Sequence, residues 1–467
     1  MMNWKNAMLG LVLVFAVAGC KDDEKDEPEC MAVGDTAPCD GGQICEMHQG
    51  GELSCAPPVR IAGTVRSTDG TPIANAHVQA RDANGAATGT SAVTAADGTY
   101  ELTVPALRAA DGSPLPAEIT LASQAQGYDL FPTAVRPALP VDLVNASAGV
   151  VAGALVVQNA ITDILLMTLP GNIAANGLIS GTLGGTDCGG VLVVAESGDA
   201  GYVGFSNADC EYTVFNVPAG AYMVSGYAAG VQLTAASAAV VAGAETTAVN
   251  LAVSDAPLST VSGTVNIVNA PGGSMTSVIL AVESTFIEGA AQVQVPRGLR
   301  VGNVTSAFTI ENVPNGKYVV LAAYENDNLV RDPDTGIGGT SIVHIEVPSL
   351  TTGNAVALPE GFKVTESLNV VSPGAEIPEQ VAAQNLTFTW MDDSSEKSYM
   401  IEVIDAFGNQ VWETTIDGVS GGDGTASVIY DGPALTPGMY YQFKVTSLNN
   451  ADIPISTTED LKGVFYL

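Results

Sequence analysis

One short stretch occurs three times along the chain: IAGTV at Ile61–Val65, ISGTL at Ile179–Leu183 and VSGTV at Val261–Val265. In each copy, apolar positions alternate with small or polar ones, which is the period-two pattern of a half-buried β-strand. A motif that returns at domain-sized spacing indicates one structural unit used three times. We call these three stretches the opening strands.

Each opening strand is followed by a matching closing strand: DGTYELTVP at Asp97–Pro105, YTVFNVPAGAY at Tyr212–Tyr222 and FTIENVPNGKY at Phe308–Tyr318. In the last two, Pro-x-Gly turns the chain into a further strand, where Tyr222 or Tyr318 is expected to point into a core. Short β-branched runs lie between turn signals, and no stretch keeps a helical period. The sequence therefore predicts an all-β protein of tandem Ig-like or transthyretin-like β-sandwiches.

The first unit resembles the carboxypeptidase regulatory-like domain, a transthyretin-like sandwich of seven strands. The resemblance is carried by IAGTVRSTDGTPIANAHVQARDANG at 61–85 and TAADGTYELTVP at 94–105. It implies a first strand at Gly63–Val65, a turn at Asp69–Ile73 and a second strand at Ala76–Val78. It covers about residues 60–143 and is looser for the two later units. In metallocarboxypeptidases of this family the sandwich is an appendage to a separate catalytic domain, so the resemblance implies no activity.

The C-terminal part has a different pattern, with strand-like runs at Leu386–Trp390, Tyr399–Val403 and Gly438–Val445. These runs resemble a fibronectin type III-like sandwich, and Trp390 and Tyr441 are its expected core residues.

The whole chain is accordingly expected to contain seven segments. They are a lipoprotein signal peptide (1–19), an acidic tether (20–29), a disulfide-rich knot (30–58), a carboxypeptidase regulatory-like sandwich (59–177), a second sandwich (178–257), a third sandwich (258–364) and a fibronectin type III-like sandwich (365–467).

The N-terminus predicts export and lipidation. Lys5 precedes an apolar run from Ala7 to Ala18, which is too short to span a bilayer and typical of a signal peptide. Val17–Cys20 (VAGC) resembles the bacterial lipobox, which implies cleavage before Cys20 and its lipidation. Residues 21–29 (KDDEKDEPE) form a charged tether. The resemblance predicts an outer-membrane lipoprotein, periplasmic-facing or surface-exposed, with the membrane as partner; an ordinary secretory signal is the alternative.

Six further cysteines predict three disulfides, because the compartment beyond the inner membrane is oxidising. Cys188 and Cys210 are expected to staple two strand-like stretches of the second sandwich. Four lie close together in the knot and allow three pairings, which the sequence leaves open; they are Cys30, Cys39, Cys45 and Cys55. A zinc site with His48 is the alternative, but no C-x2-C pair supports it, and His48 is expected in an exposed loop.

Composition argues against several functions. The 467 residues carry 16 Lys and Arg against 50 Asp and Glu, a formal net charge of −34, which opposes binding to nucleic acid. The three histidines are His48, His77 in an early strand, and His344 on a solvated strand face. No H-E-x-x-H motif is present, nor a G-x-S-x-G elbow on a strand-turn-helix, a P-loop or a dinucleotide fingerprint after a strand. We therefore expect no enzyme and no cofactor, although a glycosidase carboxylate pair could escape a sequence search.

One acidic loop, Glu325–Gly336, offers oxygen ligands that Ca²⁺ prefers, from Asp327, Asp332 and Asp334. The spacing does not follow the D-x-D-x-D-G pattern, so a solvated hairpin loop without metal is favoured over this weak calcium candidate.

Together these features predict a non-enzymatic, lipid-anchored envelope protein. Its sandwiches would form a stalk or scaffold for contact with an envelope protein or a glycan. The alternative is a carbohydrate-binding surface lipoprotein for nutrient capture, which requires an exposed coplanar pair of aromatic side chains. The ligand, the partner, the membrane face and the oligomeric state stay open.

Overall fold

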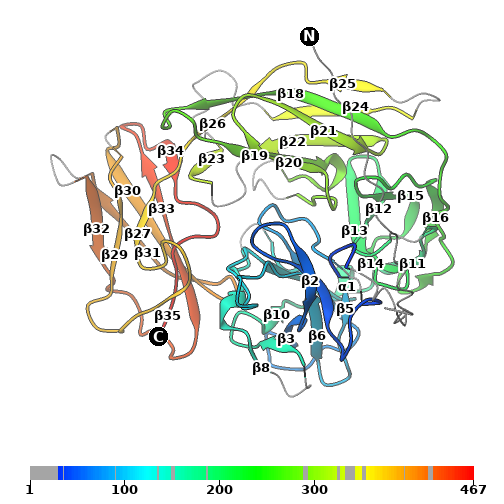
Figure 1. The fold of residues 1–467 in the computed structure, drawn as a ribbon, viewed down its shortest axis with the longest axis horizontal. Helices are drawn as coiled ribbons and strands as arrows, with labels where there is room; N and C mark the ends of the chain where they lie inside the picture. The colour runs from blue at the N-terminus through cyan, green and yellow to red at the C-terminus, as the bar shows by residue number, and fades with distance from the viewer. Residues whose placement is uncertain are drawn as a thin grey trace, which may run out of the picture.

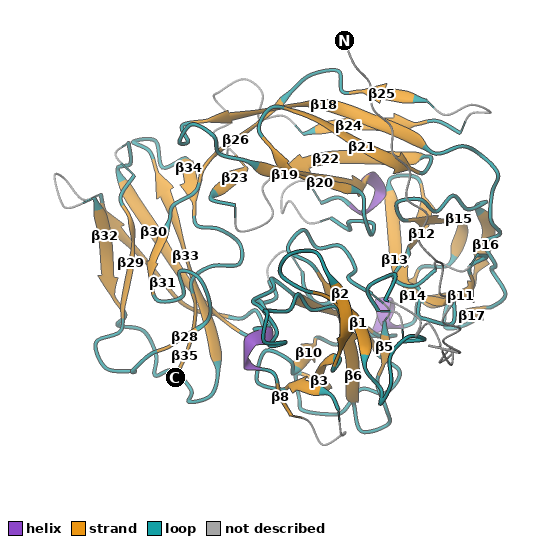
Figure 2. Ribbon diagram, in the orientation of Figure 1, coloured by secondary structure: helices purple, strands orange, loops and turns teal. Residues whose placement is uncertain are grey.

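The fold is described from a computed structural model (Figures 1 and 2). The described residues are 30–34, 36–89, 91–133, 136–148, 153–185, 188–287, 293–322, 327–331, 342–349, 354–393, 395–418 and 424–467. Lipidation of Cys20, the signal peptide and the tether are predictions that lie outside them. The all-β prediction is confirmed: within the described ranges, one four-residue helix, α1 (Gly171–Ala174), and two 3₁₀ turns, at Leu143–Asn145 and Glu283–Thr285, accompany the strands. In these ranges no helix has the length and apolarity to cross a membrane.

The knot and the first sandwich lie between the second and fourth sandwiches and below the third in the view of Figure 1. The knot is a hairpin of β1 (Ile44–Met47) and β2 (Leu53–Ala56). The first sheet of the sandwich is built on β3 (Val59–Ser67), which pairs with β6 (Thr99–Val104), β9 (Leu155–Val157) and β10 (Ile164–Leu166), with β8 (Ser147–Ala148) beside β9. Its second sheet contains β5 (Ala92–Val93), β4 (His77–Arg81) and β7 (Thr120–Gln124).

The second and third sandwiches each have two sheets. In the second these are β14 (Glu211–Val217), β11 (Gly177–Thr182) and β17 (Glu245–Thr246), facing β13 (Ala200–Phe205), β12 (Leu192–Ser197), β15 (Gly220–Tyr227) and β16 (Ala236–Val240). In the third they are β21 (Ala307–Val313), β18 (Ser259–Val268), β26 (Phe362–Glu366), β23 (Leu329–Arg331) and β25 (Ala355–Ala357), facing β20 (Arg300–Val304), β19 (Thr276–Val282), β22 (Gly316–Ala322) and β24 (Val343–Val347). β26 crosses the predicted domain boundary after residue 364.

The fourth sandwich also has two sheets, β27 (Val370–Ser372), β29 (Thr387–Met391) and β32 (Thr425–Ile429), and β28 (Glu379–Gln380), β35 (Val464–Tyr466), β33 (Tyr440–Leu448), β30 (Ser398–Asp405), β31 (Gln410–Asp417) and β34 (Pro454–Thr457). Trp390 and Tyr441 are buried in its core, as the sequence predicts.

The structure explains the glycine of the opening strand. In all three units the opening strand pairs antiparallel with its closing strand, and this glycine stands opposite an aromatic ring, as in the pairs of Gly63 with Tyr100 and Gly181 with Tyr212. A Cβ atom at either glycine would overlap a backbone carbonyl of the same sandwich. Only glycine fits where a ring and a second chain approach this closely.

The threonine after that glycine is held by a distant side chain in the first two units. One oxygen of Asp163 accepts from both the backbone N–H and the hydroxyl of Thr64, at 2.9 and 2.8 Å. Asn250 binds Thr182 in the same way, at 3.0 Å for both bonds. The opening strand is thereby tied to a segment that comes much later in its own sandwich.

The Pro-x-Gly turns also behave as predicted. Tyr222 and Tyr318 are buried, and each hydroxyl donates to a proline carbonyl four residues earlier, at 3.0 and 2.9 Å. Each ring is therefore fixed both by core packing and by a hydrogen bond to its own turn.

Candidate functional sites at the domain junctions

The second, third and fourth sandwiches form an arc around the first (Figure 1). Asn216 of the second sandwich donates to the carbonyls of Ala125 and Tyr128 in the first, at 3.0 and 2.9 Å. Arg136 of the first sandwich donates to the carbonyl of Phe407 in the fourth, at 2.8 and 3.1 Å. The first sandwich is thus the hub of the described molecule, and the candidate sites lie around it.

The knot contains two disulfides, Cys30–Cys45 and Cys39–Cys55. The structure selects this pairing among the three that the sequence allows. All four sulfurs also lie within 4.8 Å of one another. In the disulfide form they are bonded in pairs, and only the reduced thiolates could hold zinc.

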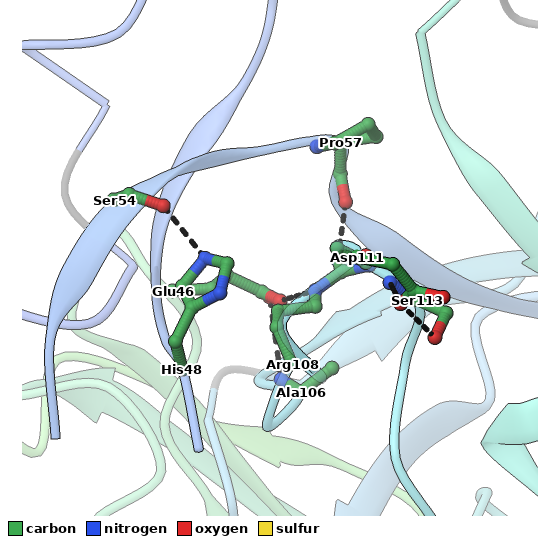
Figure 3. Close-up of polar contacts among 9 residues, drawn as sticks. Glu46, His48, Ser54, Pro57, Ala106, Arg108, Asp111 and Ser113 are labelled. Carbon is green, nitrogen blue, oxygen red and sulfur yellow. Dashed lines mark hydrogen bonds and ion pairs between the residues drawn. The ribbon is translucent and has the colours of Figure 1, made fainter. Parts of the chain in front are cut away.

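A buried ion pair fastens the knot to the first sandwich (Figure 3). The carboxylate of Glu46 lies 2.5 Å from Nε of Arg108, and both side chains are fully buried. Glu46 also accepts from the backbone of Ala106, while Arg108 donates to the carbonyl of Pro57. Burial raises the pKa of Glu46, and the hydrogen bond and charge of Arg108 oppose that shift. Sequence reasoning missed this pair, since the partners are far apart along the chain.

His48 lies in the loop between β1 and β2, as expected, but it is less exposed than the rest of that loop. The residue is half-buried, its backbone bridges to Arg108, and its Nε2 lies 2.6 Å from Oγ of Ser54 (Figure 3). A serine beside a histidine invites comparison with a catalytic triad, which needs a carboxylate to orient the imidazole. The nearby carboxylate of Glu46 is instead bonded to Arg108 and Ala106. We therefore interpret the hydrogen bond between His48 and Ser54 as a structural contact, which joins the end of β1 to β2 within the knot.

Cys188 and Cys210 form the third disulfide, as predicted. They do not join two strands, however: they lie in the segments just before β12 and β14. Cys188 is buried and Cys210 is half-buried with a left-handed φ of 64°. The bridge therefore ties two loops at one end of the second sandwich.

The other two histidines differ in environment. His344 is an exposed residue of β24, as predicted, and its Nδ1 lies 2.6 Å from Glu283. His77 begins β4 and packs edge-on against Phe215 of the second sandwich, with ring centres 5.0 Å apart. Burial lowers the pKa of His77 to about 4, so it is neutral at physiological pH.

The acidic loop is described only in part. Asp332 and Asp334 lie outside the described residues, whereas one oxygen of Asp327 accepts from the backbone of Leu329 at 3.0 Å. The negative charge of Asp327 also affects the pKa of Glu459, a residue of the fourth sandwich. Burial raises the pKa of Glu459 to about 9, and Asp327 and Asp460 add to the shift. Glu459 stands in a polar turn-like stretch, so nothing in the sequence marks it as buried.

A narrow cavity lies where the first three sandwiches meet. Its polar lining includes His77, Gln79 and Arg81 of β4, Ser91 before β5, and Gln294 of the third sandwich. Phe205 of β13 contributes an apolar wall. The alternation of β4 identifies its outward side chains, but nothing in the sequence shows that other domains cover them.

Residues 60–128 match the carboxypeptidase regulatory-like domain family, so the predicted resemblance of the first unit is confirmed. A search among curated proteins finds no match.

Solved structures resemble the chain only distantly. A DUF3823 family protein from Bacteroides ovatus has 12% identity and a TM-score of 0.22 over 45% of this chain and all of that one. BcpA, the major pilin subunit of Bacillus cereus, has 8% identity and a TM-score of 0.16 over 66% of this chain and all of that one. The 3-chlorocatechol 1,2-dioxygenase from Rhodococcus opacus 1CP has 10% identity and a TM-score of 0.17 over 27% of this chain and 64% of that one.

Proposed function

We propose that this chain is a non-enzymatic, lipid-anchored protein of the bacterial cell envelope. Its sandwiches act as a compact scaffold that presents loops and sheet faces to an envelope protein or a glycan. The observation that carries the proposal is the packing of the first sandwich against the other three, which joins four domains through direct hydrogen bonds. Such an assembly suits the display of a fixed surface.

The anchor is proposed from the sequence alone. The motif Val17–Cys20 supports lipidation of Cys20, and residues 21–29 would keep the folded part away from the bilayer. We also propose that the C-terminal sandwich is fibronectin type III-like, on the strength of its strand pattern and its buried Trp390.

The absence of enzyme activity is likewise a proposal. Among the described histidines, none joins a nucleophile and an orienting carboxylate. The stacked aromatic pairs of the described residues lie in cores or against a neighbouring domain, as Tyr440 and Tyr466 do. Nothing in that part of the chain therefore favours the carbohydrate-binding alternative.

The test combines fractionation with protease shaving of intact cells. We expect the wild type in the membrane fraction with an acylated N-terminal Cys20, and the Cys20→Ser variant in the soluble fraction. Release of sandwich peptides without lysis would place the scaffold on the cell surface, and protection until the outer membrane is opened would place it in the periplasm. An unmodified Cys20 in the mature protein would contradict the proposed anchor.

A further inference from the structure

Four cysteines meet in the knot, two from its hairpin and two from the segment that precedes it. Cys45 of β1 and Cys55 of β2 stand opposite each other in the register of the hairpin, so their side chains lie on the same face. Cys30 and Cys39 approach from the preceding segment, and each forms a disulfide with one hairpin cysteine. Cys45 is fully buried, and the other three are half-buried. The four sulfurs are therefore gathered at one point and largely withdrawn from solvent.

The distances between the two disulfides match the geometry of a metal site. The sulfur of Cys39 lies 3.7 Å from that of Cys45 and 3.8 Å from that of Cys30. The sulfurs of Cys30 and Cys55 are also 3.8 Å apart. In a tetrahedral zinc site with Zn–S bonds of about 2.3 Å, neighbouring sulfurs are about 3.8 Å apart. Three edges of such a tetrahedron already have this length, and the main change required is the separation of the two bonded pairs.

The hairpin of the knot is also held by contacts other than disulfides. The backbone N–H of Arg108 donates to the carbonyl of Met47 at 2.9 Å, beside the buried ion pair of Arg108 with Glu46. The preceding segment is attached through Gly34, whose N–H donates to the carbonyl of Cys45 at 2.8 Å. Reduction of the disulfides would therefore free the sulfurs while these contacts keep the hairpin attached to the first sandwich.

We propose that the knot, when its disulfides are reduced, binds one Zn²⁺ through the thiolates of Cys30, Cys39, Cys45 and Cys55. Two dithiol molecules break the two S–S bonds by exchange; each becomes a cyclic disulfide and leaves two thiols on the protein. The four thiols then release four protons, and the resulting thiolates bind the ion. Because the knot contains few apolar side chains, a cross-link must hold it, and zinc replaces the disulfides in this role. This site does not depend on the proposed membrane anchor.

The test is a Co²⁺ titration of the full chain in detergent, after reduction by dithiothreitol and its removal without air. We expect one Co²⁺ per chain, with the visible absorption bands of tetrahedral cobalt bound by thiolates, and its displacement by Zn²⁺, which thiolate sites select. Cys39→Ser should weaken zinc binding by more than about a hundredfold, since even changes beside the ligands cost about 10–100-fold. Two controls should bind like the wild type: the double variant Cys188→Ser, Cys210→Ser, and His48→Ala, since His48 bonds Ser54.

A second measurement guards against misfolding of Cys39→Ser. In the reduced wild type, zinc should protect all four knot cysteines from alkylation and leave the half-buried Cys210 reactive, as mass spectrometry of the peptides would show. Two results would overturn the proposal: the absence of saturable zinc and cobalt binding to the reduced wild type, or equal binding by the wild type and a folded Cys39→Ser. A cobalt spectrum that changes in His48→Ala would also overturn it, because His48 would then be a ligand.

Discussion

Replacing Glu459 by glutamine should stabilise the protein at alkaline pH. The carboxyl group is 1% exposed, and one of its oxygens has no hydrogen-bond partner. Burial, together with the charges of Asp327 and Asp460, raises its pKa from 4.5 to about 9, while Lys462 opposes the shift. The folded protein therefore keeps a proton on this group at a pH where the unfolded chain has released it.

The sign and size of the effect follow from proton binding. Between pH 4.5 and about 9 the folded state holds more protons, so this group lowers the free energy of unfolding as the pH rises through that window. Below the window it contributes no pH dependence. At pH 7 the cost amounts to roughly 3 kcal/mol, from about 1.4 kcal/mol for each pH unit above the unfolded pKa. Glutamine resembles the protonated acid and removes this cost.

The assay is calorimetric unfolding of wild type and Glu459→Gln at several values between pH 5 and 9. We expect nearly equal midpoints at pH 5 and a variant that is increasingly the more stable as the pH rises. Glu413→Gln is the control, because Glu413 is an exposed residue of the same sandwich. A variant whose pH dependence matches that of the wild type, or one that is less stable than the wild type at pH 8, would refute the reasoning.

Three other predictions concern stability. Gly63→Ala should lower the free energy of unfolding by several kcal/mol, since the added methyl group would overlap a backbone carbonyl. Gly89→Ala is the control, because Gly89 has open space around it and its replacement should be nearly neutral in a thermal unfolding experiment. Arg108→Met should cost about 3–5 kcal/mol by leaving the buried Glu46 unpaired, and adding Glu46→Gln should recover part of that loss, as a double-mutant cycle would show. Replacing Cys188 and Cys210 together by serine should cost about 3 kcal/mol in denaturant unfolding, because the bridge closes a loop of some twenty residues.

Local pattern was sufficient to predict most of the fold. The alternation of the opening and closing strands, the Pro-x-Gly turns and the buried Trp390 all depend on residues within a few positions of one another. The hydrogen bonds from Thr64 to Asp163 were not predicted, because the two residues are separated by most of a domain. The same holds for the pairing of the knot cysteines, which depends on how the hairpin folds and not on spacing.

The candidate sites were harder to predict for a related reason. Asp327 was recognised as an acid in a loop, but its neighbour Glu459 comes from another sandwich. The outward polar face of β4 could be read from the sequence, whereas its burial could not, because alternation describes one sheet and contains no information about the domains that cover it.

The arrangement of the sandwiches also bears on the order in which the chain assembles during synthesis. The first sandwich emerges first, yet residues that contact it, such as Phe407, follow Arg136 by 271 positions. Until they arrive, its outer face is exposed to water, and long-range contacts of this kind form slowly. At that stage the polar side chains of β4 can be hydrated, and exposed polar faces favour aggregation less than exposed apolar ones do. The groups that are costly to bury in the finished molecule are therefore the less hazardous ones to expose while the chain is being completed.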